Sequence, residues 1–123
     1  MSDTKRLSGR RILLVEDEAF VAMNLAMALQ DAGAIVTGPV MRLADAVAAA
    51  EAGEHDGAIL DVDLAGEDVF PAARRLDERG VPFVFHTGHG QRDEIGSDFP
   101  GSPVAKKPVP THELLALLAS VLR

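Results

Sequence analysis

The stretch Ile12–Glu18, ILLVEDE, joins four apolar residues directly to three acidic ones. A short apolar run of this kind is typical of a strand that is buried on both faces. Three acids at the exit of a buried strand repel one another, so their presence requires an explanation. Either they favour the positive end of a following helix, or they surround a positive group. The residues farther along the chain decide between these explanations.

The remaining sequence alternates between short apolar runs and segments with helical spacing. Strands are predicted at residues 12–15, 34–40, 57–62, 82–87 and 103–108. Helices are predicted at residues 21–32, 43–52, 71–79 and 111–123, and any helix in the Gly-rich residues 88–102 should be short. Strands that alternate with helices indicate an α/β fold, in which helices cover both faces of a parallel sheet through right-handed crossovers.

Length and composition limit the classes of protein to which this chain can belong. Its 123 residues suit one domain, which we expect at residues 10–123 after a flexible segment at residues 1–9. The net charge of -7 argues against binding to nucleic acid, because phosphates attract basic surfaces. The chain has no cysteine, no apolar run long enough to span a membrane and no signal-peptide pattern. We therefore expect a stand-alone, single-domain cytoplasmic protein.

The predicted sheet places polar side chains at the edge where its strands end, which is where open α/β sheets bind ligands. Four of the five predicted strands end in such residues, namely Glu16 and Asp17, Asp61 and Asp63, Thr87, and Lys106 and Lys107. The remaining strand ends at Gly38 and Pro39, which suits an edge position in the strand order 2-1-3-4-5. This convergence favours the second explanation, in which the acids surround a positive group.

The residue types at this edge suit magnesium-dependent phosphoryl transfer. Carboxylate ligands without a nearby cysteine suit a hard cation, and an incomplete cage that leaves room for water and phosphate suits Mg²⁺. A carboxylate can accept a phosphoryl group while a lysine and the metal neutralise the charge on the phosphoryl oxygens.

Four short motifs resemble those of the receiver domain of two-component response regulators, namely VEDE at 15–18, ILDVDL at 59–64, FHTG at 85–88 and KKP at 106–108. The likeness extends over nearly the whole chain from about Arg11 onward. It implies a flavodoxin-like, doubly wound sheet of five parallel strands with helices on both faces. It also implies a signalling switch, not a turnover enzyme, that receives a phosphoryl group from a histidine kinase or a histidine phosphotransfer protein.

The resemblance assigns a role to each acid. Asp61 corresponds to the residue that is phosphorylated. Asp17 would ligate Mg²⁺ directly, Glu16 would act mainly through water, and the backbone carbonyl of Asp63 would be a further ligand. Glu16 and Asp17 could also serve only to cap the first helix, and the two roles are compatible.

The same resemblance implies that Thr87 hydrogen-bonds the phosphoryl group and that Lys107 pairs with it, next to a cis bond to Pro108. The stretch PFVFHTGHG also resembles a subset of stand-alone receivers with a Phe-Ala-Thr-Gly-aromatic motif. In this chain His86 and His89 replace the alanine and the aromatic residue. We expect both histidines to be variable loop residues and not ligands of a transition metal.

Two other functions fit parts of the pattern. LDVDL also resembles the Asp-x-Asp motif of haloacid dehalogenase-type phosphatases, in which Asp61 would be the nucleophile and Asp63 the general acid. Those enzymes need a further acidic pair after the lysine, and only Glu113 follows it here. The other alternative is a receiver that binds a partner without being phosphorylated, and the complete set of site residues argues against it.

One departure from the family pattern concerns how the signal leaves the site. Most receivers carry Tyr or Phe three residues before the lysine, whereas this chain has Val104 there and no tyrosine. Valine is stiff and too small for a large rotamer change. We therefore predict that phosphorylation orders residues 87–97, where glycines weaken local structure.

Overall fold

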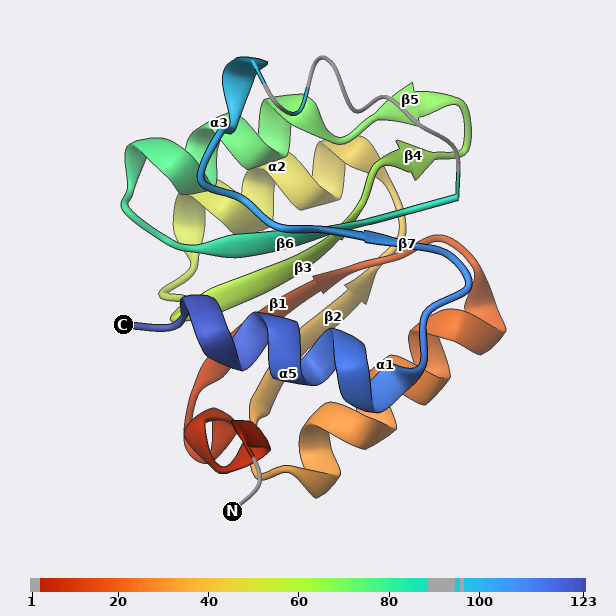
Figure 1. Cartoon of the computed structure of the whole chain (residues 1–123). Helices are drawn as coiled ribbons and strands as arrows, with labels where there is room; N and C mark the ends of the chain where they lie inside the picture. The colour runs from red at the N-terminus through yellow and green to blue at the C-terminus, as the bar shows by residue number, and fades with distance from the viewer. Residues whose placement is uncertain (1–2, 89–94, 96) are drawn as a thin grey trace.

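The structure is a computed structural model that describes residues 3–88, 95 and 97–123 (Figure 1). Its centre is a parallel sheet of five strands in the order β2-β1-β3-β6-β7. The strands are β1 Arg11–Val15, β2 Ile35–Val40, β3 Gly57–Asp61, β6 Phe83–Thr87 and β7 Val104–Lys106. Counted along the chain, this is the order 2-1-3-4-5, so the predicted fold is confirmed.

Helices cover both faces of the sheet. α1 (Ala19–Asp31) and α5 (Thr111–Val121) lie on one face, and α2 (Leu43–Ala52) and α3 (Phe70–Glu78) lie on the other (Figure 1). Among the described residues, no helix is long and apolar enough to cross a membrane.

Two predictions concern the segment between β6 and β7. These are the short helix within residues 88–102 and the ordering of residues 87–97 on phosphorylation. Both fall largely on residues 89–94 and 96, which lie outside the described residues. They stay predictions.

Strand β3 is buried along its whole length and separates two hydrophobic cores. Successive side chains of a strand point to opposite faces, so Ala58 and Leu60 pack beneath α2 and α3, whereas Ile59 packs beneath α1 and α5. Because both faces of β3 are covered, its last residue, Asp61, is held in a buried position at the edge of the sheet.

The first residues of the chain contribute to the core. A 3-10 helix, η1, spans Asp3–Leu7, and Leu7 is fully buried beneath α1 and α5. The segment is mostly polar, but the side chain of Leu7 packs in the core with residues of α1 and α5. The predicted boundary between a flexible segment at residues 1–9 and a domain at residues 10–123 stays a prediction.

Two arginines connect the beginning of the chain to its end. The guanidinium of Arg6 donates a hydrogen bond to the carbonyl oxygen of Leu122 at 2.8 Å. The guanidinium of Arg10 donates one to the carbonyl oxygen of Arg123, also at 2.8 Å. The last residue of the chain therefore lies beside the start of β1.

A short hairpin follows β3, and the sequence patterns do not predict it. Strands β4 (Asp63–Leu64) and β5 (Glu67–Asp68) pair antiparallel, and Ala65 and Gly66 form the turn between them. Their φ angles are 53° and 90°, and a type I′ turn requires positive φ at both of its central residues.

Two peptide bonds that precede proline are cis. The cis bond between Lys107 and Pro108 agrees with the prediction from the resemblance. The other joins Gly38 and Pro39 in β2, which is an edge strand as predicted. Gly38 has a φ of 117° and lies so close to the carbonyl oxygen of Leu14 that a Cβ atom would not fit.

Candidate functional site

The predicted site residues meet at the carboxyl ends of the strands. Asp61 and Thr87 are the last residues of β3 and β6. Glu16 directly follows β1, and Lys107 directly follows β7. A pocket of about 310 Å³ opens at this edge, lined by Asp17, Glu18, Asp61, Val62, Asp63, Thr87, Gly88 and Lys107.

Lys107 is the positive group that the acids surround. Its Nζ lies 3.0 Å from Oε1 of Glu16, 3.2 Å from Oε1 of Glu18 and 3.5 Å from Oδ2 of Asp61. Burial alone would lower the pKa of the lysine, but the neighbouring carboxylates outweigh that effect, so its pKa is raised. Lys107 therefore stays charged. Lys106, by contrast, is exposed on the surface.

Asp61 is the most perturbed acid of the site. The pKa of its carboxyl is raised to about 8, first by burial and then by the hydrogen bond to Glu16 and the charge of Glu16, while the charge of Lys107 acts in the opposite direction. Only 4% of Asp61 is exposed. A carboxyl in such surroundings favours its proton unless more positive charge arrives.

Glu16 is almost completely buried, with 1% of its surface exposed. One carboxylate oxygen, Oε1, accepts the hydrogen bond from Lys107. The other, Oε2, is buried and has no hydrogen-bond partner within the described part of the chain. A buried oxygen of this kind is costly unless a cation or a water molecule contacts it.

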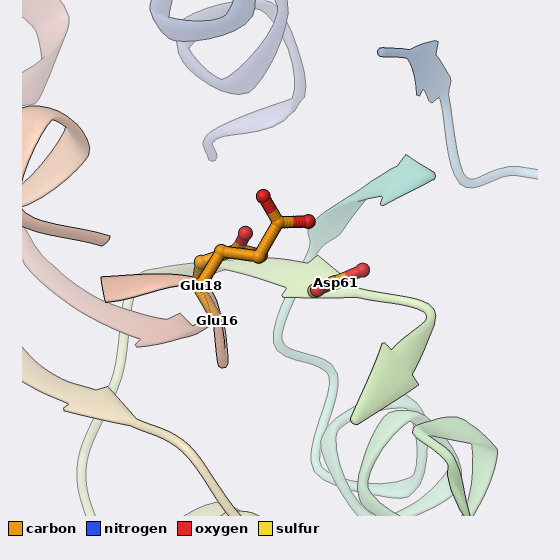
Figure 2. A group of neighbouring side chains, drawn as sticks. All are labelled: Glu16, Glu18 and Asp61. Carbon is orange, nitrogen blue, oxygen red and sulfur yellow. The ribbon is translucent and has the colours of Figure 1, made fainter. Parts of the chain in front are cut away.

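Glu18 is a member of the site that the sequence patterns do not single out. One carboxylate oxygen from each of Glu16, Glu18 and Asp61 lies within 4.8 Å of the others. Figure 2 shows the three side chains gathered at this end of the sheet. The only signal in the sequence is the third acid of ILLVEDE, which could equally belong to the first turn of α1.

The two remaining acids hold the turn of the β4–β5 hairpin. Oδ2 of Asp17 accepts a hydrogen bond from the backbone N–H of Ala65 at 2.9 Å. Oδ1 of Asp63 accepts one from the backbone N–H of Gly66 at 2.8 Å. The backbone N–H of Asp63 also donates to Oδ1 of Asp61, at 3.4 Å. The hairpin therefore contributes Asp63 to the lining of the pocket and is attached to the exits of both β1 and β3.

Thr87 and Lys107 are connected through their backbones. Thr87 is buried, and its carbonyl oxygen accepts a hydrogen bond from the N–H of Lys107 at 2.7 Å. This bond fixes the exit of β7 against the exit of β6. The hydroxyl-bearing residue and the lysine thus line the same pocket.

His86 lies in β6 and not in a loop, so the predicted loop position is wrong for this residue. The alternation of the strand buries it on the face that α1 and α5 cover, and only 5% of it is exposed. Burial, and then the charge of Lys107, lowers the pKa of His86 to about 4, while the charge of Glu18 acts in the opposite direction. The ring is therefore neutral at neutral pH. His89 lies outside the described residues.

The chemistry of the acidic cluster fits a hard divalent cation. The available ligand atoms are all oxygens, one oxygen of Glu16 is buried without a partner among the described residues, and burial and the nearby Glu16 raise the pKa of Asp61. An ion such as Mg²⁺ prefers oxygen ligands, would contact the buried oxygen and would lower the pKa of Asp61.

Comparison with known proteins gives consistent matches. The family model of the response regulator receiver domain matches residues 12–118. The transcriptional regulatory protein TcrA of Mycobacterium tuberculosis is 38% identical over 122 residues, which cover 96% of this chain and 48% of that protein. The transcriptional regulatory protein PdtaR of the same species is 36% identical over 95 residues, covering 76% of this chain and 46% of that protein. The chain thus spans about half the length of these curated relatives.

Solved structures match over nearly the full length of both chains. SdrG from Sphingomonas melonis Fr1 is 40% identical, with a TM-score of 0.72 and coverage of 95% of this chain and 98% of that one. The receiver domain of the sensor histidine kinase PA1611 from Pseudomonas aeruginosa PAO1 is 28% identical, with a TM-score of 0.74 and coverage of 92% and 99%. That structure contains a magnesium ion coordinated in its active-site cleft.

Proposed function

Because the chain belongs to the response regulator receiver domain family, we propose that it is a signalling switch in which Asp61 accepts a phosphoryl group. The observation that carries this proposal is the buried carboxyl of Asp61 at the end of β3, with the ammonium of Lys107 3.5 Å away. A buried acid with a raised pKa that borders a pocket is poorly explained by stability, because burial of the charged form is costly.

The proposed reaction transfers a phosphoryl group from a phosphohistidine of the donor protein. An oxygen of Asp61 attacks the phosphorus and forms a new O–P bond. The P–N bond to the histidine breaks, and the imidazole leaves with the electron pair and takes up a proton. The ammonium of Lys107 and the hydroxyl of Thr87 stabilise the charge on the phosphoryl oxygens.

The acids of the site provide the ligands for a cation. We propose that Asp17, Asp61 and the backbone carbonyl of Asp63 hold Mg²⁺ and that Glu16 acts mainly through water. When bound, the ion supplies positive charge to the phosphoryl oxygens and lowers the pKa of the acceptor carboxyl. Oδ2 of Asp17 already accepts a hydrogen bond from Ala65, so its other oxygen is the one we expect to serve as the ligand.

The partner on the input side is proposed to be a sensor histidine kinase or a histidine phosphotransfer protein. We also propose that the protein acts in the cytoplasm and is not a turnover enzyme. The negative net charge supports an output through another protein and not through nucleic acid. The named relatives are transcriptional regulatory proteins about twice as long as this chain.

Mass spectrometry after incubation with acetyl phosphate and Mg²⁺ tests the proposal. The wild type should gain the mass of one phosphoryl group, whereas Asp61→Asn and the wild type in EDTA should gain none. Asp77→Asn, which removes an exposed acid of α3, is the matched control and should behave like the wild type.

Three results would contradict parts of the proposal. A mass gain in Asp61→Asn would move the acceptor to another residue. No gain in the wild type would favour a receiver that works without phosphorylation. Continuous release of many phosphates per protein molecule would favour a phosphatase, because a receiver stops near one.

A further inference from the structure

Two of the three N–H donors of Lys107 are already used in hydrogen bonds to carboxylates in this structure. An ammonium group has three N–H donors. Three carboxylates, those of Glu16, Glu18 and Asp61, lie 3.0 to 3.5 Å from its Nζ. If Lys107 is to give more than one N–H donor to a phosphoryl group on Asp61, it must weaken or release its contact to Glu16 or to Glu18.

The contact to Glu18 is the one that can be released most easily. Glu16 is 1% exposed, so loss of its ion pair would leave a buried charge without a partner. Asp61 is the proposed acceptor itself, so the contact of Lys107 with its carboxylate would be replaced by a contact with the phosphoryl group. Glu18 is 60% exposed, so water can replace the ammonium at little cost in free energy.

The side chain of Glu18 does not cap the helix that follows it. Glu18 occupies the N-cap position of α1, where side chains commonly accept a hydrogen bond from the first turn, but it makes no such bond. Its carboxylate instead reaches Lys107, 89 residues farther along the chain. The backbone of Glu18 still serves the helix, because its carbonyl oxygen accepts the hydrogen bond from Ala22.

We infer that Glu18 is a positioning residue that holds Lys107 in the unphosphorylated protein and competes with the phosphoryl group for it. This inference rests on the proposed function of Asp61. It predicts that Glu18 weakens the binding of a phosphoryl group on Asp61 because it occupies one donor of Lys107.

Competition must be separated from the simple effect of negative charge. Glu18→Gln removes the charge, so it should weaken Mg²⁺ binding while it strengthens binding of the anionic phosphoryl group. Glu18→Asp keeps the charge but shortens the side chain by one methylene, so its carboxylate should no longer reach Lys107. If competition for Lys107 is the cause, Glu18→Asp should leave Mg²⁺ affinity near the wild-type value and still strengthen binding of the phosphoryl group.

The test measures two affinities on the purified protein, that of Mg²⁺ alone and that of beryllium fluoride, a phosphoryl analogue, at saturating Mg²⁺. Both Glu18 variants should bind beryllium fluoride about two- to fivefold more tightly than the wild type, which is the range expected from loss of an exposed ion pair. Glu54→Gln is the control, because it makes the same charge change at an exposed residue near the opposite edge of the sheet.

The outcomes distinguish this inference from the proposed function. If the wild type binds beryllium fluoride but Glu18→Asp binds it no more tightly, the inference is overturned and the proposed function is not. If Glu18→Asp instead loses Mg²⁺ affinity in proportion to Glu18→Gln, Glu18 acts as a metal ligand and the inference is overturned. If the wild type does not bind beryllium fluoride at all, both the inference and the proposed function are overturned.

Discussion

At the scale of single residues, Asp61 meets two opposing requirements. Its carboxyl must be deprotonated to attack phosphorus, yet burial and the neighbouring Glu16 raise its pKa to about 8. At neutral pH and without a cation, most molecules therefore carry a proton on the proposed nucleophile. A divalent cation in the acidic cluster would remove that proton and contribute charge to the reaction, so the burial of Asp61 supports the proposed need for metal.

The raised pKa of Asp61 predicts that stability depends on pH. The pKa is about 8 in the folded protein and 3.8 in the reference state, so between these values the folded protein keeps a proton that the unfolded chain has lost. The free energy of unfolding must then decrease as pH rises through this window. Asp61→Asn lacks this dependence. In EDTA, its gain in Tm over the wild type should be small near pH ~4 and largest at pH ~8.

Calorimetry across this pH range checks the prediction. Saturating Mg²⁺ should reduce the difference in Tm between Asp61→Asn and the wild type at pH ~8, because the ion stabilises the deprotonated carboxyl. Asp77→Asn should show a constant difference at every pH. A constant difference for Asp61→Asn as well would mean that Asp61 does not hold a proton in the folded state.

The sequence predicts which residues gather at the site but not how their side chains pair. Asp61, Thr87 and Lys107 were predicted at the site because the ends of parallel strands share an edge. The contact between Glu18 and Lys107 joins residues 89 positions apart, and it depends on the angle at which α1 leaves β1. No local sequence pattern predicts that angle, so the sequence does not indicate that Glu18 contacts Lys107.

At the scale of the elements, the β4–β5 hairpin determines the shape of the site. Its turn is held by Asp17 from the exit of β1 and by Asp63 within its own first strand. Ala65 adopts a φ of 53° in this turn, a conformation that costs most residues about 1–2 kcal/mol. A substitution in this turn can therefore relieve strain without altering an acid.

Replacement of Ala65 by Asn should stabilise the protein. Asparagine tolerates positive φ better than alanine, and Asn-Gly is a preferred pair for type I′ turns. The backbone N–H that Asp17 accepts is kept. We expect the free energy of unfolding to rise by about 0.5–1 kcal/mol in urea denaturation. Ala48→Asn, at an exposed position of α2, should instead lower it, because Asn is a poor helix former. Destabilisation in both variants would contradict the role of the turn.

Most of the elements are predicted from the sequence because their patterns are local. The strands β1, β3 and β6 are continuous apolar runs, and the helices carry apolar residues at helical spacing. The β4–β5 hairpin is not predicted, because strands of two residues have no measurable periodicity. Its turn is Ala-Gly, which is a weaker hairpin signal than Asn-Gly. The two predictions for His86 conflict, because the histidine pair is expected in a loop whereas the strand predicted at residues 82–87 includes His86, and the structure agrees with the strand.

At the scale of the whole molecule, four phenylalanines connect separate parts of one core. Phe85 of β6 lies 6.0 Å from Phe70 of α3, 5.3 Å from Phe83 and 5.4 Å from Phe99, measured between ring centroids. Phe99 also contacts Phe70 and Phe83. The strand that ends at Thr87 is thus packed against both α3 and the residues that lead into β7.

Truncation of Phe85 should therefore destabilise the whole fold. Phe85→Ala removes a fully buried ring from this cluster and should lower the free energy of unfolding by about 3–5 kcal/mol in urea denaturation. Phe20→Ala, at a position that is 84% exposed, should change it by less than about 0.5 kcal/mol. Phe85→Leu, with a smaller expected loss, serves if Phe85→Ala does not fold. Equal effects at Phe85 and Phe20 would contradict the central place of the cluster.

The hydrogen bond from Arg10 to the carbonyl oxygen of Arg123 determines where a module attached after Arg123 would start. Arg123 lies beside the start of β1, whereas Asp61 lies at the end of the parallel strand β3, so the two occupy opposite rims of the sheet (Figure 1). A linker that continues from Arg123 would start at the edge of the sheet that lies far from Asp61. A module attached there would therefore sense the proposed switch through contacts with the domain and not through direct contact with Asp61.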